Sequence, residues 1–515
     1  MKPFSFLHKT GKYRIKPTDD KININIEKDQ KINDDLSQNI LFIKNALGNS
    51  SDLVIRQFQI AENRNMALVH IDSISDKKYI QNVVMEIIAS VKNSPEKSRE
   101  DFIGYISRLP LSAGRVKSIA DFQTVLKNLV SGNTIFLADG YSECLALDTQ
   151  NGENRAIEEP SSQTVVRGPK DGFTENLRTN TALIRKRIKD DDLRVESMII
   201  GRITKTNVSI LYMSRIANPK IVEEIRIRLN RIDIDGIMDS GHIEELIQDD
   251  AYTPFPTIYN SERPDTIAAG LLEGRIAIIV DGSPFVLLAP AVFISFFQSS
   301  EDYYQHFYIS SLIRILRYVA FFLTLLTPSI YIAITTFHQE MLPTPLLISI
   351  AAQREGVPFP AFLEALLMEA TFEILREAGI RMPRAIGPAI SIVGALVLGQ
   401  AAVQAGIVSA VMVIVVSLTA ISSFVAPSYV MSIAVRVLRF IFMLLAASLG
   451  LYGLSMGLIA LVLHLCSLRS FGVPYMAPLA PHIKKNNRDN FLRFPIRKME
   501  FRPKFINRGN PVRQK

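Results

Sequence analysis

Cysteine is scarce in this sequence of 515 residues, which contains only Cys144 and Cys466. Neither stands at a spacing typical of a zinc site, and two isolated cysteines do not make a disulfide framework. The N-terminal stretch MKPFSFLHKTGKYRIKPTDDKININIEKDQ also lacks the apolar core of a signal peptide. We therefore expect the N-terminal half of the chain to lie in a reducing cytoplasm.

Charge of either sign is missing from residues 385–435, a stretch of 51 residues without Asp, Glu, Lys or Arg. A helix that crosses a membrane needs roughly 20 apolar residues. A buried soluble core would explain one such run, but four candidate runs stand within about 150 residues. We therefore predict an all-α polytopic transmembrane domain over 301–468, with spans near 318–337, 386–405, 407–431 and 440–465.

The basic excess belongs to the end of the chain. The formal net charge is +8, yet residues 484–515 alone carry 11 Lys or Arg against 2 Asp or Glu. The preceding chain is therefore close to neutral, which argues against nucleic acid as a partner. We expect 469–515 to be a basic cytoplasmic tail. Its interleaved phenylalanines suit contact with anionic membrane lipids, and the alternative is a disordered end that merely follows the topology rule for positive charge.

The N-terminal half is predicted to contain two α/β subdomains. We expect a disordered polar leader over 1–36, a first subdomain over 37–150, and a second over 151–300 with a linker at its start. Two hairpins share one frame, because NTIFLADGYSECLAL turns at Asp139-Gly140 and RIAIIVDGSPFVLLA turns at Asp281-Gly282. The shared frame indicates related subdomains, with a chance match as the alternative.

Motifs for catalysis are absent. The stretch VVRGPKDGFTENLRTNTALIRKRIKDDD (165–192) has the spacing of neither a P-loop nor a dinucleotide-binding loop. No nucleophile, base or metal cluster accompanies the acidic residues described below. We therefore expect no enzyme activity, no cofactor and no metal.

The segment FLEALLMEATFEILREAGIRMPR (362–384) places charges between membrane spans. Most of it belongs to 343–379, which we expect to be re-entrant or amphipathic. Pro360 and Gly379 suit the two ends of a helix. At 100° per residue three glutamates share one face, whereas the fourth falls on the apolar face. One interpretation is an interfacial helix with a solvated acidic side. The other is an acidic vestibule with one buried coupling carboxylate, and its candidates are Glu364, Glu369, Glu373 and Glu377.

The next predicted span has two different faces. One is a stripe of glycine, alanine and serine, which lets helices approach closely. The other is an aliphatic stripe that ends in two glutamines. Packing alone would explain both stripes. If several copies surrounded one axis, the second stripe would form an apolar gate at Val393 and Val397, and its pore-lining candidates are Ile386, Ile390, Val393, Val397, Gln400 and Gln404.

Several segments closely resemble the A-subunit family of GerA-type spore germinant receptors. They include IDGIMDSGHIEELIQD, RPDTIAAGLLEGRIAIIVDGSPFVLLAP and REGVPFPAFLEALLMEATFEILREAGIRMPRAIGPAISIVGALVLGQ, and the similarity runs from about Glu158 to about Pro481. The resemblance implies a multi-pass protein of the spore inner membrane with two α/β subdomains. It further implies a homo-oligomer that works with a transporter-like B subunit and a lipoprotein C subunit.

The resulting hypothesis is a non-enzymatic A subunit that forms a nutrient-gated cation-release channel and starts germination. The first alternative is a transporter-like or scaffold subunit, for which discontinuous helices would be suitable. The second is a cytoplasmic signalling domain with a passive membrane anchor.

Overall fold

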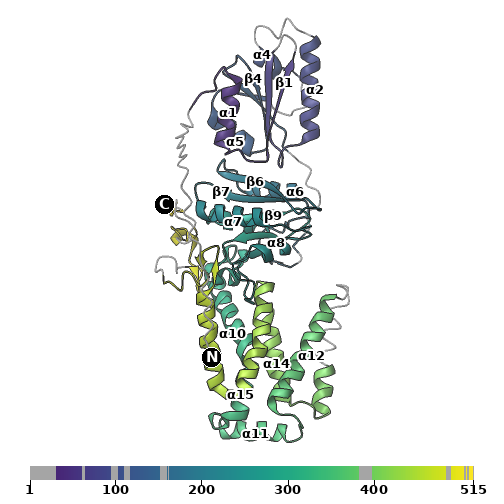
Figure 1. The fold of residues 1–515 in the computed structure, drawn as a ribbon, viewed down its shortest axis with the longest axis vertical. Coiled ribbons are helices and arrows are strands. Elements are labelled where there is room, and N and C mark those ends of the chain that lie inside the picture. Colours follow the sequence, from purple (N-terminus) through teal and green to yellow (C-terminus); the bar gives the residue numbers. More distant parts are fainter. Residues whose placement is uncertain are drawn as a thin grey trace, which may run out of the picture.

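A computed structural model of the chain describes residues 30–60, 64–93, 102–109, 116–150, 159–160, 162–381, 397–482, 489–503, 506 and 510–513. Three bodies are stacked along the long axis (Figure 1). Two α/β bodies come first in the sequence, and a bundle of helices forms the other end. The C-terminal segment returns to the level at which the second α/β body meets the helices.

The first α/β body is a five-stranded antiparallel sheet between two pairs of helices. Its strand order is β1-β2-β4-β5-β3, with β1 Leu53–Ile60, β2 Arg64–Ile71, β3 Val116–Ile119, β4 Thr134–Ala138 and β5 Cys144–Leu147. One face packs on α1 (Leu36–Ala46) and α5 (Phe122–Val130), and the other on α2 (Lys77–Asn93) and α4 (Phe102–Ser107). Because both faces are covered, β4 and β5 are buried at every position and read as continuous apolar runs.

The second α/β body repeats this arrangement. Its strand order is β6-β7-β9-β10-β8, with β6 Leu193–Ile200, β7 Thr206–Met213, β8 Tyr259–Ser261, β9 Ile276–Val280 and β10 Val286–Ala289. Here α6 (Leu177–Arg187) and α9 (Pro264–Leu272) cover one face, and α7 (Pro219–Arg231) and α8 (Ser240–Ile247) the other. If the five strands of each body are numbered in chain order, both sheets have the order 1-2-4-5-3. Both sheets lie in the N-terminal α/β region that the sequence predicts, and each has helices on both faces.

The repeat extends to single hydrogen bonds at the two predicted hairpins. The carboxylate of Asp139 accepts a bond of 3.2 Å from the backbone N–H of Leu36, and that of Asp281 accepts one of 3.1 Å from Leu177. The glycine after each aspartate has a φ of 82° or 89°, in the left-handed region that such a turn requires. The shared hairpin frame therefore reflects one repeated structural unit.

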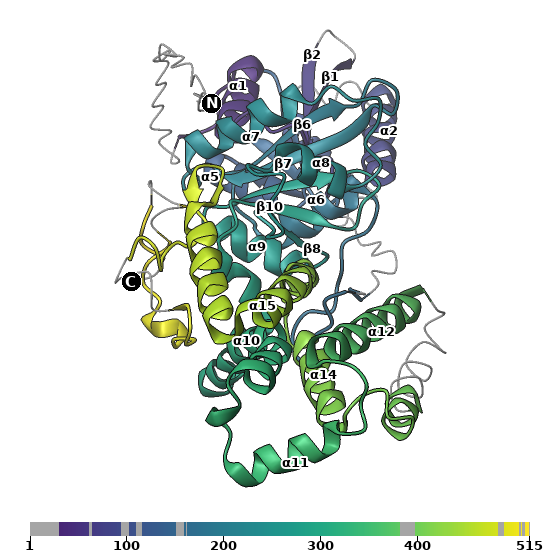
Figure 2. The same cartoon turned by 60° about the horizontal axis from the view of Figure 1, so that its bottom comes forward.

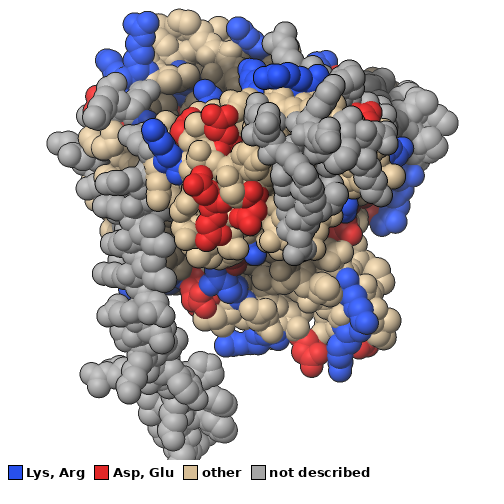
Figure 3. Space-filling model, turned by 90° about the horizontal axis from the view of Figure 1, so that it is seen from above, with Lys and Arg blue, Asp and Glu red and all other residues tan. Residues whose placement is uncertain are grey.

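The two α/β bodies meet through polar contacts. Arg185 of α6 forms an ion pair of 2.9 Å with Asp52, and the two side chains are 1% and 9% exposed. The backbone N–H of Ser51 also donates to the carbonyl of Val195 at 2.8 Å. Figure 3 shows the end of the molecule seen from above, where acidic and basic side chains both occur among uncharged ones. Such mixed charge is typical of a surface exposed to water.

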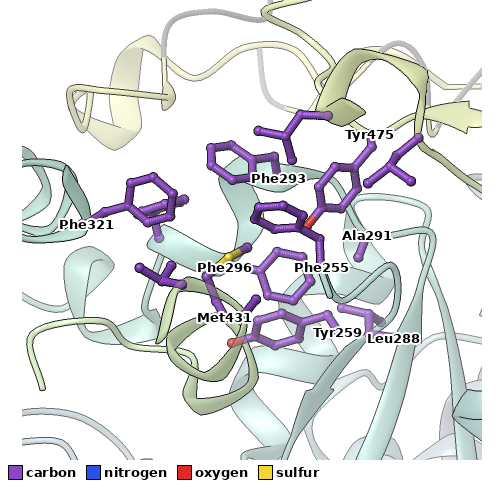
Figure 4. Packing of buried hydrophobic residues seen from close by; sticks show 14 of the residues in the cluster. Phe255, Tyr259, Leu288, Ala291, Phe293, Phe296, Phe321, Met431 and Tyr475 are labelled. Carbon is purple, nitrogen blue, oxygen red and sulfur yellow. The ribbon is translucent and has the colours of Figure 1, made fainter. Parts of the chain in front are cut away.

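The second body meets the helices through aromatic residues instead. Phe293 lies within 6.0 Å, centroid to centroid, of Phe321 in α10 and of Tyr475 near the chain's end. These residues share a buried cluster with Phe255, Phe296 and Met431 (Figure 4). The core of the second α/β body therefore continues into the helical domain without interruption.

The helical part begins with two 3₁₀ turns, η1 (Phe293–Phe297) and η2 (Ser300–Tyr303). The helices that follow are α10 (Phe307–Phe337), α11 (Thr344–Arg354), α12 (Ala361–Arg381), α14 (Ala410–Ser423) and α15 (Tyr429–Ser467), with η3 (Gln339–Met341) before α11. Residues 397–404 are also helical. Beyond α15, β11 (Arg469–Ser470) pairs with β12 (Val473–Pro474), and η5 (Ile496–Lys498) follows. An α/β region followed by a helical region is the predicted order of the chain.

Among the described residues, α10 and α15 are long and apolar enough to cross a membrane. The helix α10 contains the predicted span 318–337. The predicted span 440–465 is interrupted, because Gly450 within α15 has a non-helical φ of 60°. A Cβ added at Gly457 would meet Leu445 and Phe442, so the chain turns back after Gly450. The predicted span 407–431 is instead divided, since α14 ends at Ser423 and α15 starts at Tyr429. Pro427 lacks an N–H, and Ser428 caps the new helix by accepting from the N–H of Met431. Of the predicted span 386–405, only residues from 397 onward lie in the described part.

Candidate functional site

The charged helix α12 packs against the helical bundle and places its glutamates in different surroundings. It contacts α14, α10 and α15. Glu364 and Glu369 are fully buried, Glu373 is half-buried, and Glu377 is exposed. The acidic face expected from the sequence is therefore divided, because Glu369 lies inside the protein whereas Glu377 does not.

Glu364 joins α12 to the beginning of α14. One of its carboxylate oxygens accepts hydrogen bonds of 2.5 Å from both the backbone N–H and the hydroxyl of Ser409. Ser409 is the N-cap residue of α14, so the carboxylate lies at the positive end of that helix, where negative charge is stabilised. The other oxygen has no hydrogen-bond partner among the described residues, and Nε of Arg354 lies 3.8 Å away from it. This carboxylate is anchored on one side only.

Glu369 and Glu373 join α12 to α15. Arg439 lies 2.8 Å from Glu369 and 3.1 Å from Glu373, and Arg436 lies 2.6 Å from Glu373. The side chains of Glu369 and Arg439 are 0% and 1% exposed, so both charges are removed from water. Charged groups in such a position remain ionised only when they are paired.

These ion pairs account for a difficulty in the sequence. Arg436 and Arg439 lie in the N-terminal part of α15, a helix long and apolar enough to cross a membrane, where charged side chains are costly. The structure neutralises both arginines with glutamates of α12. The sequence spacing is consistent with this pairing. The two glutamates are four residues apart and the two arginines are three residues apart, so each pair lies on one side of its own helix.

The remaining charges of α12 have local partners. Arg376 lies over the ring of Phe424, 5.1 Å from its centroid, a distance typical of a cation–π contact. Glu377 pairs with Arg381 at 2.6 Å, one turn further along the helix, and both side chains are more than half exposed. Such an exposed pair contributes little to stability.

Part of the predicted pore-lining stripe lies on the exposed side of the helical segment 397–404. Val397, Gln400 and Gln404 are exposed in the single chain, and 53% of Val397 is accessible. Gly399 is buried, and a Cβ added there would meet Val413 of α14 at 3.5 Å. The small-residue side of this segment therefore faces α14. Ile386, Ile390 and Val393 lie outside the described residues.

A second group of buried charges lies where the chain enters α10. Asp302 accepts from Arg314 at 3.1 Å and from Arg317 at 2.8 Å, and Arg314 also contacts Asp489 at 2.9 Å. Tyr303 donates its hydroxyl hydrogen to Asp489 at 2.5 Å. Burial raises the pKa of Asp489 above its usual range, although Arg314 and these hydrogen bonds oppose the shift. The sequence analysis identified neither this cluster nor its two aspartates.

Within the part of the chain that the structure describes, no group of three or more His, Cys, Asp or Glu side chains could hold a metal ion. The buried carboxylates of α12 face arginines and a serine. These carboxylates therefore hold α12 in position against α14 and α15 by hydrogen bonds and ion pairs.

The chain is similar to several spore germination proteins. The family model described as Bacillus/Clostridium GerA spore germination protein matches residues 42–505. Spore germination protein KA of Bacillus subtilis (strain 168) is 49% identical over 488 residues, which cover 94% of this chain and 89% of that protein. Spore germination protein B1 of the same organism is 40% identical and is covered completely.

A solved structure shares part of the sequence. The N-terminal domain of the A subunit of the Bacillus megaterium spore germinant receptor GerK3 is 41% identical. The alignment covers 52% of this chain and 98% of that one, with a TM-score of 0.42. Together with the match along residues 42–505, the full-length similarities establish that the chain belongs to the GerA family of spore germination proteins, the A-subunit family of germinant receptors.

Proposed function

We propose that copies of this chain surround a common axis in the spore inner membrane and form a nutrient-gated cation-release channel that starts germination. The observation that carries the proposal is the exposed stripe Val397, Gln400 and Gln404, opposite a glycine that faces α14. Within the described part of a single chain, this stripe is left exposed. In a ring of copies, its aliphatic part would exclude water and ions, and the glutamines would line the mouth.

The stripe would continue through the preceding residues. Ile386, Ile390 and Val393 precede Val397 at helical spacing. Val393 and Val397 are one turn apart in the sequence, and we assign the apolar gate to them. Because a hydrophobic constriction gates by losing its water, a small increase in its polarity or width opens it.

The glutamates of α12 would couple the gate to the rest of the protein. Glu364 holds Ser409, which follows the helical segment 397–404 after a short turn. Glu369 and Glu373 hold α15 on the other side of α12. A movement of α12 relative to α15 would therefore displace the gate-bearing segment. Glu377, which is exposed, is the candidate for the acidic vestibule that attracts cations.

The arrangement of the two long helices supports cytoplasmic N- and C-terminal regions in a multi-pass protein. The start of α10 and the end of α15 both lie at the end of the bundle that meets the second α/β body (Figure 1). At that end, His464 of α15 lies 2.9 Å from the hydroxyl of Thr253. Both helices thus start or finish on one side, which requires an even number of crossings.

The partners in the proposal come from the family. A transporter-like B subunit would hold the nutrient, and a lipoprotein C subunit would complete the complex. Anionic lipids would contact the basic tail. The proposed role of this chain is to convert the nutrient signal into ion release.

The test combines the oligomeric state with conductance. The full-length protein is reconstituted in planar bilayers, alone and with its B and C subunits, and cation current is recorded. We expect Val397→Ala to raise current in the absence of nutrient, because the gate loses apolar surface. The matched control is Leu398→Ala, at the neighbouring exposed position that points about 100° away on the helix. A monomer, or equal effects of the two variants, would contradict the proposal.

A transporter-like or scaffold subunit is the second candidate. The observation that favours it is helix interruption, because α14 and α15 are separated by a break and Gly450 has a non-helical φ of 60° within α15. Interrupted helices are common at transporter sites. Nutrient counterflow without ionic current in the same bilayers would favour this candidate.

A further inference from the structure

A cavity of about 300 Å³ lies at the base of the second α/β body, away from the charged helix. Residues of β8, α9 and η2 and of the C-terminal segment line it. A smaller cavity of about 110 Å³ shares Arg275 and Ser295 with it. A volume of about 300 Å³ is at the lower end of small-molecule sites in proteins.

Three residues that line the cavity each carry a buried polar atom that has no hydrogen-bond partner in the part of the chain that the structure describes. These atoms are Nε of Arg275 and the hydroxyl oxygens of Ser295 and Ser300. Arg275 is 7% exposed and Ser295 is 5% exposed. A buried polar atom that loses water without gaining a partner costs about 1–3 kcal/mol, so three such atoms on residues around one cavity favour an acceptor that these side chains can turn toward. All three can donate a hydrogen bond.

The carboxylates around the cavity already have donors. Asp265 accepts bonds of 2.7 Å from both Arg263 and the hydroxyl of Tyr304. Asp489 is held by Arg314 and Tyr303, as described above. Glu273 contacts a terminal nitrogen of Arg275 at 3.3 Å, which leaves Nε of the arginine unused. The unmet requirement of this cavity is therefore for a hydrogen-bond acceptor.

We propose that this cavity binds a small molecule whose carboxylate or phosphate group accepts hydrogen bonds from Arg275, Ser295 and Ser300. An anionic oxygen acceptor suits an arginine better than a neutral one, because the bonds are charge-assisted. Tyr259, Leu288 and Met499 line the same cavity and offer a surface for a compact apolar body. The proposal does not depend on channel activity.

The position of the cavity would let a bound molecule influence the start of α10 through residues that contact both. Tyr303 and Gln298 line it, and both donate hydrogen bonds to Asp489, which contacts Arg314 near the start of α10. A molecule bound here would touch the residues that hold this junction together. Anionic lipid headgroups and soluble metabolites share the required chemistry, so the experiment must separate them.

The probes are phenyl phosphate, benzoate and the neutral benzamide, titrated calorimetrically into the full-length protein in phosphatidylcholine nanodiscs. We expect saturable binding of at least one anion and none of benzamide. Arg275→Gln is expected to weaken binding at least tenfold, and Ser295→Ala several-fold. Glu273→Gln is expected to tighten it, because a like charge is removed and a terminal nitrogen of Arg275 is released. Arg202→Gln is the matched control, since Arg202 belongs to the same α/β body and its side chain is 64% exposed.

Glu273→Gln is expected to tighten anion binding, whereas Arg275→Gln is expected to weaken it. The Glu273→Gln variant therefore still tests the proposal if Arg275→Gln fails to fold. Anion binding that is unchanged in Arg275→Gln or Ser295→Ala, weaker in Glu273→Gln, or absent altogether would overturn the proposal. Vesicles of phosphatidylglycerol and of phosphatidylcholine identify the source of the anion. Preference for phosphatidylglycerol that is lost in Ser295→Ala assigns a lipid headgroup, whereas phenyl phosphate or benzoate binding without that preference assigns a soluble anion.

Discussion

Glu369 of α12 and Arg439 of α15 form an ion pair of 2.8 Å in which neither side chain is more than 1% exposed. The two residues are 70 positions apart in the sequence. They lie on different helices, and each of these helices also packs against α10. The pair fixes the position of α12 because neither charge can reach water while the helices remain in contact. Separating the helices would require both ions to be solvated or neutralised.

Arg439→Gln should destabilise the protein strongly. Removal of one partner leaves Glu369 buried without a counter-charge, which typically costs about 3–5 kcal/mol. The measurement is the thermal unfolding midpoint of the protein in nanodiscs. Arg381→Gln breaks an exposed pair and is the matched control, with an expected change of about 0–1 kcal/mol. Similar effects of the two substitutions would mean that the buried pair does not hold the helices.

Glu364→Gln should slow germination without loss of the protein. Glutamine keeps an oxygen that can accept from Ser409, but it removes the negative charge at the start of α14. The measurement is the germination rate of spores at saturating nutrient, with the abundance of the protein determined by immunoblot. Germination at the wild-type rate would remove the coupling role of this residue.

His70 should make the first α/β body sensitive to acid. Desolvation by burial lowers its pKa from 6.5 to about 4, against the opposing effect of Asp72. The folded protein therefore binds fewer protons than the unfolded chain between pH 6.5 and 4, so this contribution to stability is lost as the pH falls through that range. His70→Gln should flatten the dependence of the unfolding midpoint on pH there. Parallel curves for the variant and the wild type would contradict the assignment.

The two cysteines should differ in reactivity. Burial in the first sheet raises the pKa of Cys144 to about 12, whereas Cys466 is exposed in the single chain. Thiolate is the reactive form of cysteine, so at pH 8 a maleimide should modify Cys144 only after unfolding. The measurement is mass spectrometry of the Cys466→Ser variant with and without denaturant. Rapid modification of Cys144 under native conditions would show that this sheet opens readily.

The sequence predicted the elements that depend on local patterns. The hairpins at Asp139-Gly140 and Asp281-Gly282 were identifiable because their turn residues and apolar strands are contiguous. Their shared frame also indicated the repeat that the strand orders confirm. The helix from Pro360 to Gly379 was predicted within a few residues of α12, since its start and its charged pattern are local.

Contacts between distant segments could not be predicted in the same way. The pairing of Glu369 with Arg439 depends on how α12 and α15 pack, which no local pattern specifies. The same holds for Asp302 and Asp489, which come together at Arg314 although they are 187 positions apart in the sequence. The break after Ser423 was missed because the apolar run continues through it, and only Pro427 and Ser428 indicate a new helix.

The most direct test of the central claim is cross-linking between copies at the exposed stripe. Single cysteines are placed at Val397 and at Leu398 in a chain without native cysteines, and spore membranes are oxidised with copper phenanthroline. Copies that face a shared axis should give a cross-linked product through Val397→Cys and much less through Leu398→Cys. No cross-linking at Val397→Cys, together with its modification by lipid-soluble reagents alone, would place the stripe against the acyl chains and contradict the account.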